Sequence, residues 1–92
     1  MRITVEYAAQ IKRAAGRASE ALDLGEPSTV QDAVRQVSER HGEAMDSLLF
    51  AGAGRLHPSI LLFVGDAQVR WDQPRELRDG DVLTILSPIS GG

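Results

Sequence analysis

Residues 28–42 are the stretch of this chain that most limits its possible folds, because apolar residues recur there at helical spacing. Thr29 precedes the pattern as an N-cap, Asp32 stands three residues later as in a capping box, and Gly42 follows as a stop. The apolar face would consist of Val30, Ala33, Val34 and Val37. The polar, solvent-facing side would consist of Gln31, Arg35, Gln36, Glu39 and Arg40. We therefore predict a helix over residues 29–41 that covers one face of one sheet.

The segments around this helix have the alternation of half-buried strands. We predict five strands, over residues 2–8, 18–24, 59–66, 68–71 and 82–87. In the second of them the apolar marks are weak: Ala18, Ala21 or Leu22, and Leu24. Short helical turns are expected within AQIKRAAGR and EAMDSLLF, and AGAGR at residues 51–55 is expected to be a flexible loop. Leu77 is expected to pack under the polar loop before the last strand, where Gly80 can adopt a positive φ in a tight turn.

This order of elements predicts an α+β domain with a mixed sheet of about five strands and one main helix packed on one face. That is the β-grasp arrangement, in which the first and last strands lie parallel at the centre of the sheet. The last strand then directs the C-terminal end of the chain out of the sheet. With 92 residues, we expect one domain over residues 1–87 and a flexible tail over residues 88–92 that ends in Gly-Gly.

Composition excludes several classes of function. A formal net charge of −3 and an isoelectric point near 5.2 argue against a nucleic-acid partner. The absence of cysteine excludes disulfides, a thiol nucleophile and a cysteine-based zinc site. His41 and His57 lack metal-ligand spacing and are expected to be structural or surface residues, so we expect no metal. No apolar run is long enough to cross a membrane and no signal peptide is visible, which predicts a cytoplasmic protein.

Residues 77–92, LRDGDVLTILSPISGG, combine a leucine, a Gly-Asp turn, an apolar strand, a proline and a terminal Gly-Gly. This segment resembles the C-terminus of the MoaD/ThiS family of ubiquitin-like sulfur carriers. STVQDAVRQV resembles the main helix of that family, and YAAQIKRAAG is similar to the segment after its first strand. GRLHPSILLFVGDAQVRW is most similar to the carriers that serve cysteine and related biosynthesis. The small subunit of molybdopterin synthase commonly has a phenylalanine before a Pro-Pro pair, where this chain has Ile85-Leu86-Ser87-Pro88, and this difference also favours the cysteine type.

The resemblance implies a carrier protein and not an enzyme. A partner enzyme would use ATP to adenylate the carboxyl group of Gly92, and sulfide or a persulfide would displace AMP to leave a thiocarboxylate. A downstream biosynthetic enzyme would accept the sulfur, so ATP and the sulfur source belong to the partners and no cofactor is bound by this chain. Gly91 and Gly92 lack a Cβ that would obstruct a narrow channel, Pro88 ends the strand, and Ile89 and Ser90 are spacer residues.

A docking surface for these partners is expected on the sheet face that the helix leaves uncovered. Strand alternation puts Leu61 and Phe63 on that face, together with Leu86 of the last strand. We expect the chain to be a monomer that docks transiently.

Three alternatives remain open from the sequence. The chain could be the small subunit of molybdopterin synthase, or a ubiquitin-like modifier in which Gly92 is joined to target lysines. It could also be a plain binding module with an inert tail. The acceptor of the sulfur remains open as well, and cysteine, thiamin, molybdopterin, a siderophore, another sulfur-containing metabolite or a modified nucleoside all fit.

Overall fold

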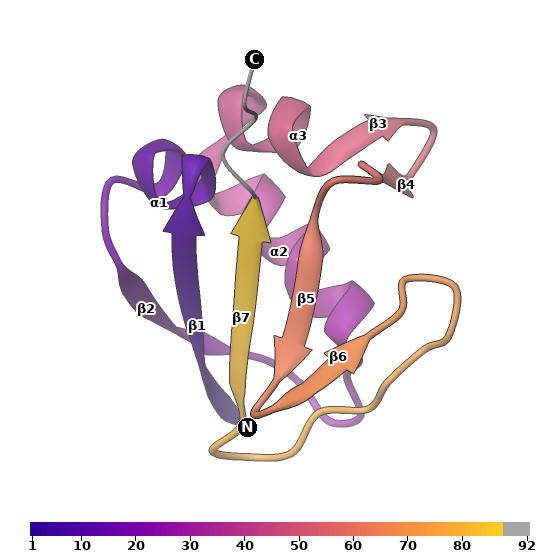
Figure 1. The fold of residues 1–92 in the computed structure, drawn as a ribbon. Helices are drawn as coiled ribbons and strands as arrows, with labels where there is room; N and C mark the ends of the chain where they lie inside the picture. Colours follow the sequence, from indigo (N-terminus) through magenta and orange to yellow (C-terminus); the bar gives the residue numbers. More distant parts are fainter. Residues whose placement is uncertain (88–92) are drawn as a thin grey trace.

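The computed structural model describes residues 1–87, which form a five-stranded sheet, three helices and a separate two-stranded hairpin (Figure 1). The elements in chain order are β1 (Arg2–Ala9), α1 (Gln10–Ala15), β2 (Ser19–Asp23), α2 (Val30–His41), α3 (Glu43–Leu49), β3 (Phe50–Gly52), β4 (Arg55–Leu56), β5 (Leu61–Val64), β6 (Ala67–Val69) and β7 (Val82–Ser87). None of the helices within the described residues has the length and apolarity that a membrane crossing requires.

The five-stranded sheet has the order β2-β1-β7-β5-β6. β1 and β7 are parallel neighbours, and the other pairs are antiparallel. Helix α2 crosses behind the sheet in Figure 1, so one sheet face packs against it and the other faces away. The mixed sheet, its central parallel pair and its single long helix confirm the β-grasp prediction.

Apolar and polar residues alternate along the strands, and the apolar residues form the core between the sheet and α2. In β1, Ile3, Val5 and Tyr7 are buried whereas the residues between them are exposed. The predicted apolar face of α2 is buried against them, and Leu77 is buried below the loop that precedes β7. Gly80 has a φ of 88°, as the predicted turn requires.

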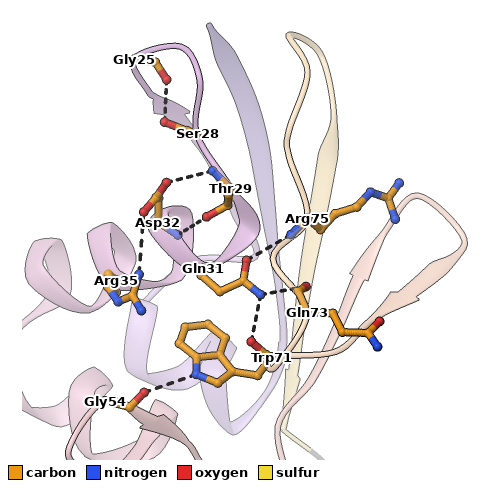
Figure 2. A network of polar contacts seen from close by, with 10 residues as sticks. All are labelled: Gly25, Ser28, Thr29, Gln31, Asp32, Arg35, Gly54, Trp71, Gln73 and Arg75. Carbon is orange, nitrogen blue, oxygen red and sulfur yellow. Dashed lines mark hydrogen bonds and ion pairs between the residues drawn. The ribbon is translucent and has the colours of Figure 1, made fainter.

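The N-terminus of α2 forms the predicted capping box (Figure 2). The Asp32 backbone N–H donates to Thr29 Oγ1 over 3.1 Å, and the Thr29 backbone N–H donates to a carboxylate oxygen of Asp32 over 2.9 Å. Two backbone donors that the first helical turn leaves unpaired are therefore satisfied. The helix ends at His41, before Gly42, as expected.

Gln31 is buried, and the prediction that it lies on the solvent-facing side of the helix is wrong. Figure 2 shows its carboxamide turned toward the loop between β6 and β7. Its Nε2 donates to the carbonyl oxygens of Trp71 and Gln73 over 3.1 Å and 3.2 Å, and its Oε1 accepts from the Arg75 backbone N–H over 3.4 Å. The Val30 backbone N–H also donates to Arg75 O over 2.8 Å. These bonds tie the loop that leads into β7 to the start of α2.

Residues 51–55 are not the flexible loop that their glycines suggest. Phe50–Gly52 and Arg55–Leu56 pair as the antiparallel hairpin β3–β4, and left-handed backbone at Gly52, Ala53 and Gly54 closes its turn. The Phe50 ring meets the Trp71 ring edge-on, with centroids 5.7 Å apart, and the Trp71 indole N–H donates to Gly54 O over 3.3 Å. Aromatic packing from a distant loop therefore holds the hairpin, and this contact is not visible in the local sequence.

The third predicted strand is shorter than expected, because it begins at Leu61 and not at residue 59. Residues 57–60 form a turn instead, in which the Ile60 backbone N–H donates to His57 O over 3.0 Å. Pro58 favours this turn, since its fixed φ suits a turn and it has no backbone N–H for a sheet.

In the second predicted strand Leu22 and Leu24 are buried as predicted, whereas Ala18 is exposed and Glu20 occupies the core position that precedes Leu22 on the same side of the strand. Glu20 accepts hydrogen bonds from the Tyr7 hydroxyl and from Arg40 Nη1, the latter over 2.9 Å, and His41 Nε2 contacts its second oxygen. Burial raises the pKa of Glu20, but the hydrogen bonds from Tyr7 and His41 outweigh it and leave the pKa below its usual value. Burial and the neighbouring carboxylate raise the pKa of Tyr7.

Candidate functional site

The face of the sheet opposite α2, called the outer face below, contains the three residues predicted to dock partners. Leu61, Phe63 and Leu86 lie on it and are half-buried. Leu62 and Val64, which alternate with them in β5, are buried in the core. One side of β5 and of β7 packs against α2, and the other side of each strand lies on the outer face.

Strand register brings these residues together in rows across the outer face. Leu61 is opposite Leu86, which is opposite Ala8 of β1. In the next row, Phe63 is opposite Thr84. Val82, which is 36% exposed, follows along β7 on the same face. We call Ala8, Leu61, Phe63, Val82 and Leu86 the outer apolar patch.

The outer apolar patch includes more of the surface than the sequence indicated. The alternation of β7 could have identified Val82, since it shares a side with Leu86. Ala8 could not be identified, because its position beside Leu86 follows from the parallel register of β1 and β7. These five side chains have no acid, base or nucleophile, so the patch can bind an apolar surface but cannot itself catalyse a reaction.

The outer apolar patch extends to the end of β7, which is also the end of the described chain. Ser87 pairs with Ala9 of β1, is buried, and donates from Oγ to Gln10 Oε1 over 3.4 Å. Ala9 has a φ of 57° and turns the chain into α1 at the same row of the sheet. β1 therefore leads into α1 at the row of the sheet where Ser87, the last described residue, pairs with it.

The remaining predicted site residues lie outside the described residues. These are Pro88, Ile89, Ser90, Gly91 and Gly92. The predicted chemistry at Gly92 therefore rests on the sequence motif.

One hollow in the described part of the chain contains none of the predicted site residues. It has a volume of about 780 Å³ and lies between α2, α3 and the β3–β4 hairpin. Its walls combine Arg35 with the acidic residues Glu39 and Asp46, and it opens widely to solvent. This mixture of charges defines no ligand. Within residues 1–87, no three His, Asp or Glu side chains gather in a way that could hold a metal ion.

Comparison with known proteins gives a family match over nearly the whole chain. The model of the ThiS family matches residues 5–92. An uncharacterised protein of Archaeoglobus fulgidus is 41% identical over 71 residues, which are 77% of this chain and 74% of that protein. The molybdopterin synthase sulfur carrier subunit of Chlamydomonas reinhardtii is 28% identical over 92 residues, which are 100% of both chains.

Solved structures share the architecture. SAMP1 of Haloferax volcanii superposes with a TM-score of 0.90 at 24% identity and covers 100% of both chains. A chain of the BexX/CysO complex of Amycolatopsis orientalis superposes with a TM-score of 0.69 at 28% identity, over 98% of this chain and 99% of that one. The sheet and helix described above thus form the β-grasp fold of ubiquitin-like proteins.

Proposed function

This chain belongs to the ThiS family, and from that membership we propose that it is a sulfur carrier whose C-terminal glycine, Gly92, receives the sulfur. The observation behind the proposal is that the family match extends to residue 92 and so includes the Gly91-Gly92 pair. The full-length similarity to a protein named as a sulfur carrier subunit also supports it.

The proposed chemistry takes place on a partner enzyme. A carboxylate oxygen of Gly92 attacks the α-phosphorus of ATP, and pyrophosphate leaves to give an acyl-adenylate. Hydrosulfide then attacks the carbonyl carbon, the bond from that carbon to the AMP oxygen breaks, and AMP leaves with the electron pair. After loss of one proton the product is a thiocarboxylate, which a second enzyme uses as its sulfur donor. In this scheme the chain is a substrate and not a catalyst, and it works in the cytoplasm, where the partner finds ATP.

The outer apolar patch is the proposed docking surface for the activating partner. Leu86 lies in the patch and on the strand that leads to Gly92, so a partner that binds the patch also receives the last residues from a defined position. Gly92 is six positions after Leu86, and an extended chain of that length spans at most about 20 Å. The adenylation centre of the partner is therefore expected within about 20 Å of its contact with Leu86.

The first test is adenylation by the cognate activating enzyme, measured as ATP–pyrophosphate exchange. Wild-type chain should support exchange, and a chain without Gly91 and Gly92 should support none. Phe63→Ala should raise the KM for the carrier, whereas Glu39→Ala, an exposed substitution on α2 at the other side of the sheet, should leave it unchanged. Equal exchange with the truncated chain would show that the tail is not the reactive group.

The small subunit of molybdopterin synthase is the second candidate, favoured by the name of the Chlamydomonas relative. A stable complex with a large catalytic subunit, purified from the native cell, would support this role. The third possibility, a protein modifier, gains no support from SAMP1, because likeness at 24% identity shows the fold alone. Conjugates that survive reductant on a denaturing gel and disappear when Gly91 and Gly92 are deleted would establish it.

A further inference from the structure

The basic residues of this acidic chain are unevenly distributed. Residues 7–19 contain Lys12, Arg13 and Arg17 and no acidic residue, whereas the rest of the chain contains seven basic and thirteen acidic residues. Lys12 is the only lysine. One short segment is therefore strongly positive in a chain whose net charge is −3.

These three side chains surround one hollow beside α1. It has a volume of about 570 Å³ and is lined by Ala9, Lys12, Arg13, Gly16 and Arg17. Ala9 and Gly16 are small, so the three cationic side chains form most of its border. All three are exposed. We call Lys12, Arg13 and Arg17 the basic cluster.

The basic cluster is largely free to bind a partner. Lys12 and Arg13 form no ion pair within residues 1–87, and Arg17 reaches Glu20 only at 3.8 Å, with 59% of its own side chain exposed. Four other arginines are already paired with neighbouring carboxylates. Exposed cations without a carboxylate nearby raise the local potential and attract anionic groups.

The position of the basic cluster connects it to the proposed docking surface. Ala8 belongs to the outer apolar patch, and the next residue, Ala9, lines the basic hollow. Figure 1 shows α1 at the end of the sheet where β1 and β7 finish. Ser87 at the end of β7 contacts Gln10, the first residue of α1, so a partner that covers Leu86 also lies near the helix that contains Lys12 and Arg13.

We propose that the basic cluster is the electrostatic half of the docking surface and receives aspartate and glutamate side chains on the activating enzyme, a proposal that rests on the function proposed above. An open hollow with only exposed cations lacks the enclosed donors that would fix a small anion such as phosphate. Carboxylates on a protein surface suit it better, because several can meet the three cations at once while the outer apolar patch is covered. Such pairs speed and orient association more than they tighten it.

The test compares two charge reversals that change the net charge equally. K12E/R13E removes two members of the basic cluster, and R75E/R78E reverses two exposed arginines that form no ion pair within the described residues. In the activation assay at about 50 mM salt, K12E/R13E should raise the KM for the carrier about tenfold, and at about 500 mM salt the increase should largely disappear. R75E/R78E should change KM less than about threefold at either salt concentration. Equal effects of the two variants, or no effect of K12E/R13E, would overturn the proposal.

A second measurement does not depend on the activating enzyme. A hexaglutamate peptide titrated into ¹⁵N-labelled chain should shift amide signals of residues 9–17, and these shifts should be lost in K12E/R13E and kept in R75E/R78E. Inorganic phosphate at matched ionic strength should shift them less. Peptide shifts that persist in K12E/R13E, or that are as large at residues 75–78, would overturn the proposal. If no form of the chain is adenylated, the proposed function fails, and the peptide titration alone decides whether the basic cluster binds carboxylates.

Discussion

Replacement of Gln31 by leucine tests how the loop before β7 is held. The substitution keeps a side chain of similar size in a buried position but removes both ends of the carboxamide. Trp71 O and Gln73 O lose donors at 3.1 Å and 3.2 Å, and the Arg75 backbone N–H loses a weaker acceptor at 3.4 Å. At about 1 kcal/mol for each of the two shorter bonds, Gln31→Leu should lower the free energy of unfolding by about 2 kcal/mol. In a domain of this size that corresponds to a fall of about 10 °C in Tm.

Gln36→Leu is the matched control, because Gln36 lies on the same helix and donates one exposed bond to Asp23 O over 3.1 Å. Gln36→Leu should lower the free energy of unfolding by about 0.5 kcal/mol. Both variants are measured by urea unfolding followed by circular dichroism. If Gln31→Leu costs no more than Gln36→Leu, the carboxamide does not hold the loop and the reasoning is refuted.

Gln31→Glu adds a dependence on pH to the same test. The introduced carboxylate would face the carbonyl oxygens of Trp71 and Gln73, which disfavour its charged form and raise its pKa above the usual value of about 4.3. A raised pKa in the fold means that stability is greatest below that value and is lost as the pH rises. Gln31→Glu should therefore lose stability relative to wild type between about pH 4 and pH 7. A constant difference over that range would contradict the geometry.

Three further substitutions test the buried carboxylate, the outer apolar patch and a backbone turn. Glu20→Gln should lower the free energy of unfolding by about 2 kcal/mol at pH 7, because the charge-assisted hydrogen bonds of the carboxylate are lost. Since the pKa of Glu20 is lowered in the fold, its contribution is complete above about pH 4.3 and disappears as the pH falls further, so wild type and variant should converge in acid unfolding curves. Phe63→Ala should weaken binding to the activating enzyme at least about tenfold in calorimetry while Tm falls only modestly, and equal binding would remove the patch from the interface. Gly80→Ala should lower the free energy of unfolding by about 1 kcal/mol, because φ is 88° at this residue. An added Cβ would meet no atom at Gly80 or at Gly25, so Gly25→Ala, where φ is not positive, should be neutral or slightly stabilising. Similar thermal shifts for the two variants would contradict the backbone explanation.

Local pattern was sufficient to predict the parts of the fold in which each residue's position depends on its near neighbours. Thr29 and Asp32 are three residues apart, so the capping box and the start of α2 followed from the sequence. The alternation in residues 82–87 gave the bounds of β7, and also the side of the sheet on which Leu86 lies. The order of these elements then led to the β-grasp sheet with parallel central strands.

The errors occurred where a residue's position depends on a distant partner. Gln31 looks like a surface residue until the loop at residues 71–75 supplies carbonyl oxygens 40 and more positions away. Glu20 occupies a buried strand position that usually takes an apolar residue, and its burial is tolerated because Tyr7, Arg40 and His41 surround it. The basic cluster was also missed, since Lys12, Arg13 and Arg17 become one border only when α1 and its following turn are in place.

The most direct measurement of the central proposal is an intact mass of the chain after incubation with its activating enzyme, ATP and sulfide. If the chain is a sulfur carrier, its mass should increase by the exchange of one oxygen for one sulfur, and fragmentation should place the sulfur on Gly92. A chain without Gly91 and Gly92 should remain unchanged under the same conditions. An unchanged mass of the full chain, with an enzyme already shown to adenylate it, would contradict the proposed role in sulfur transfer.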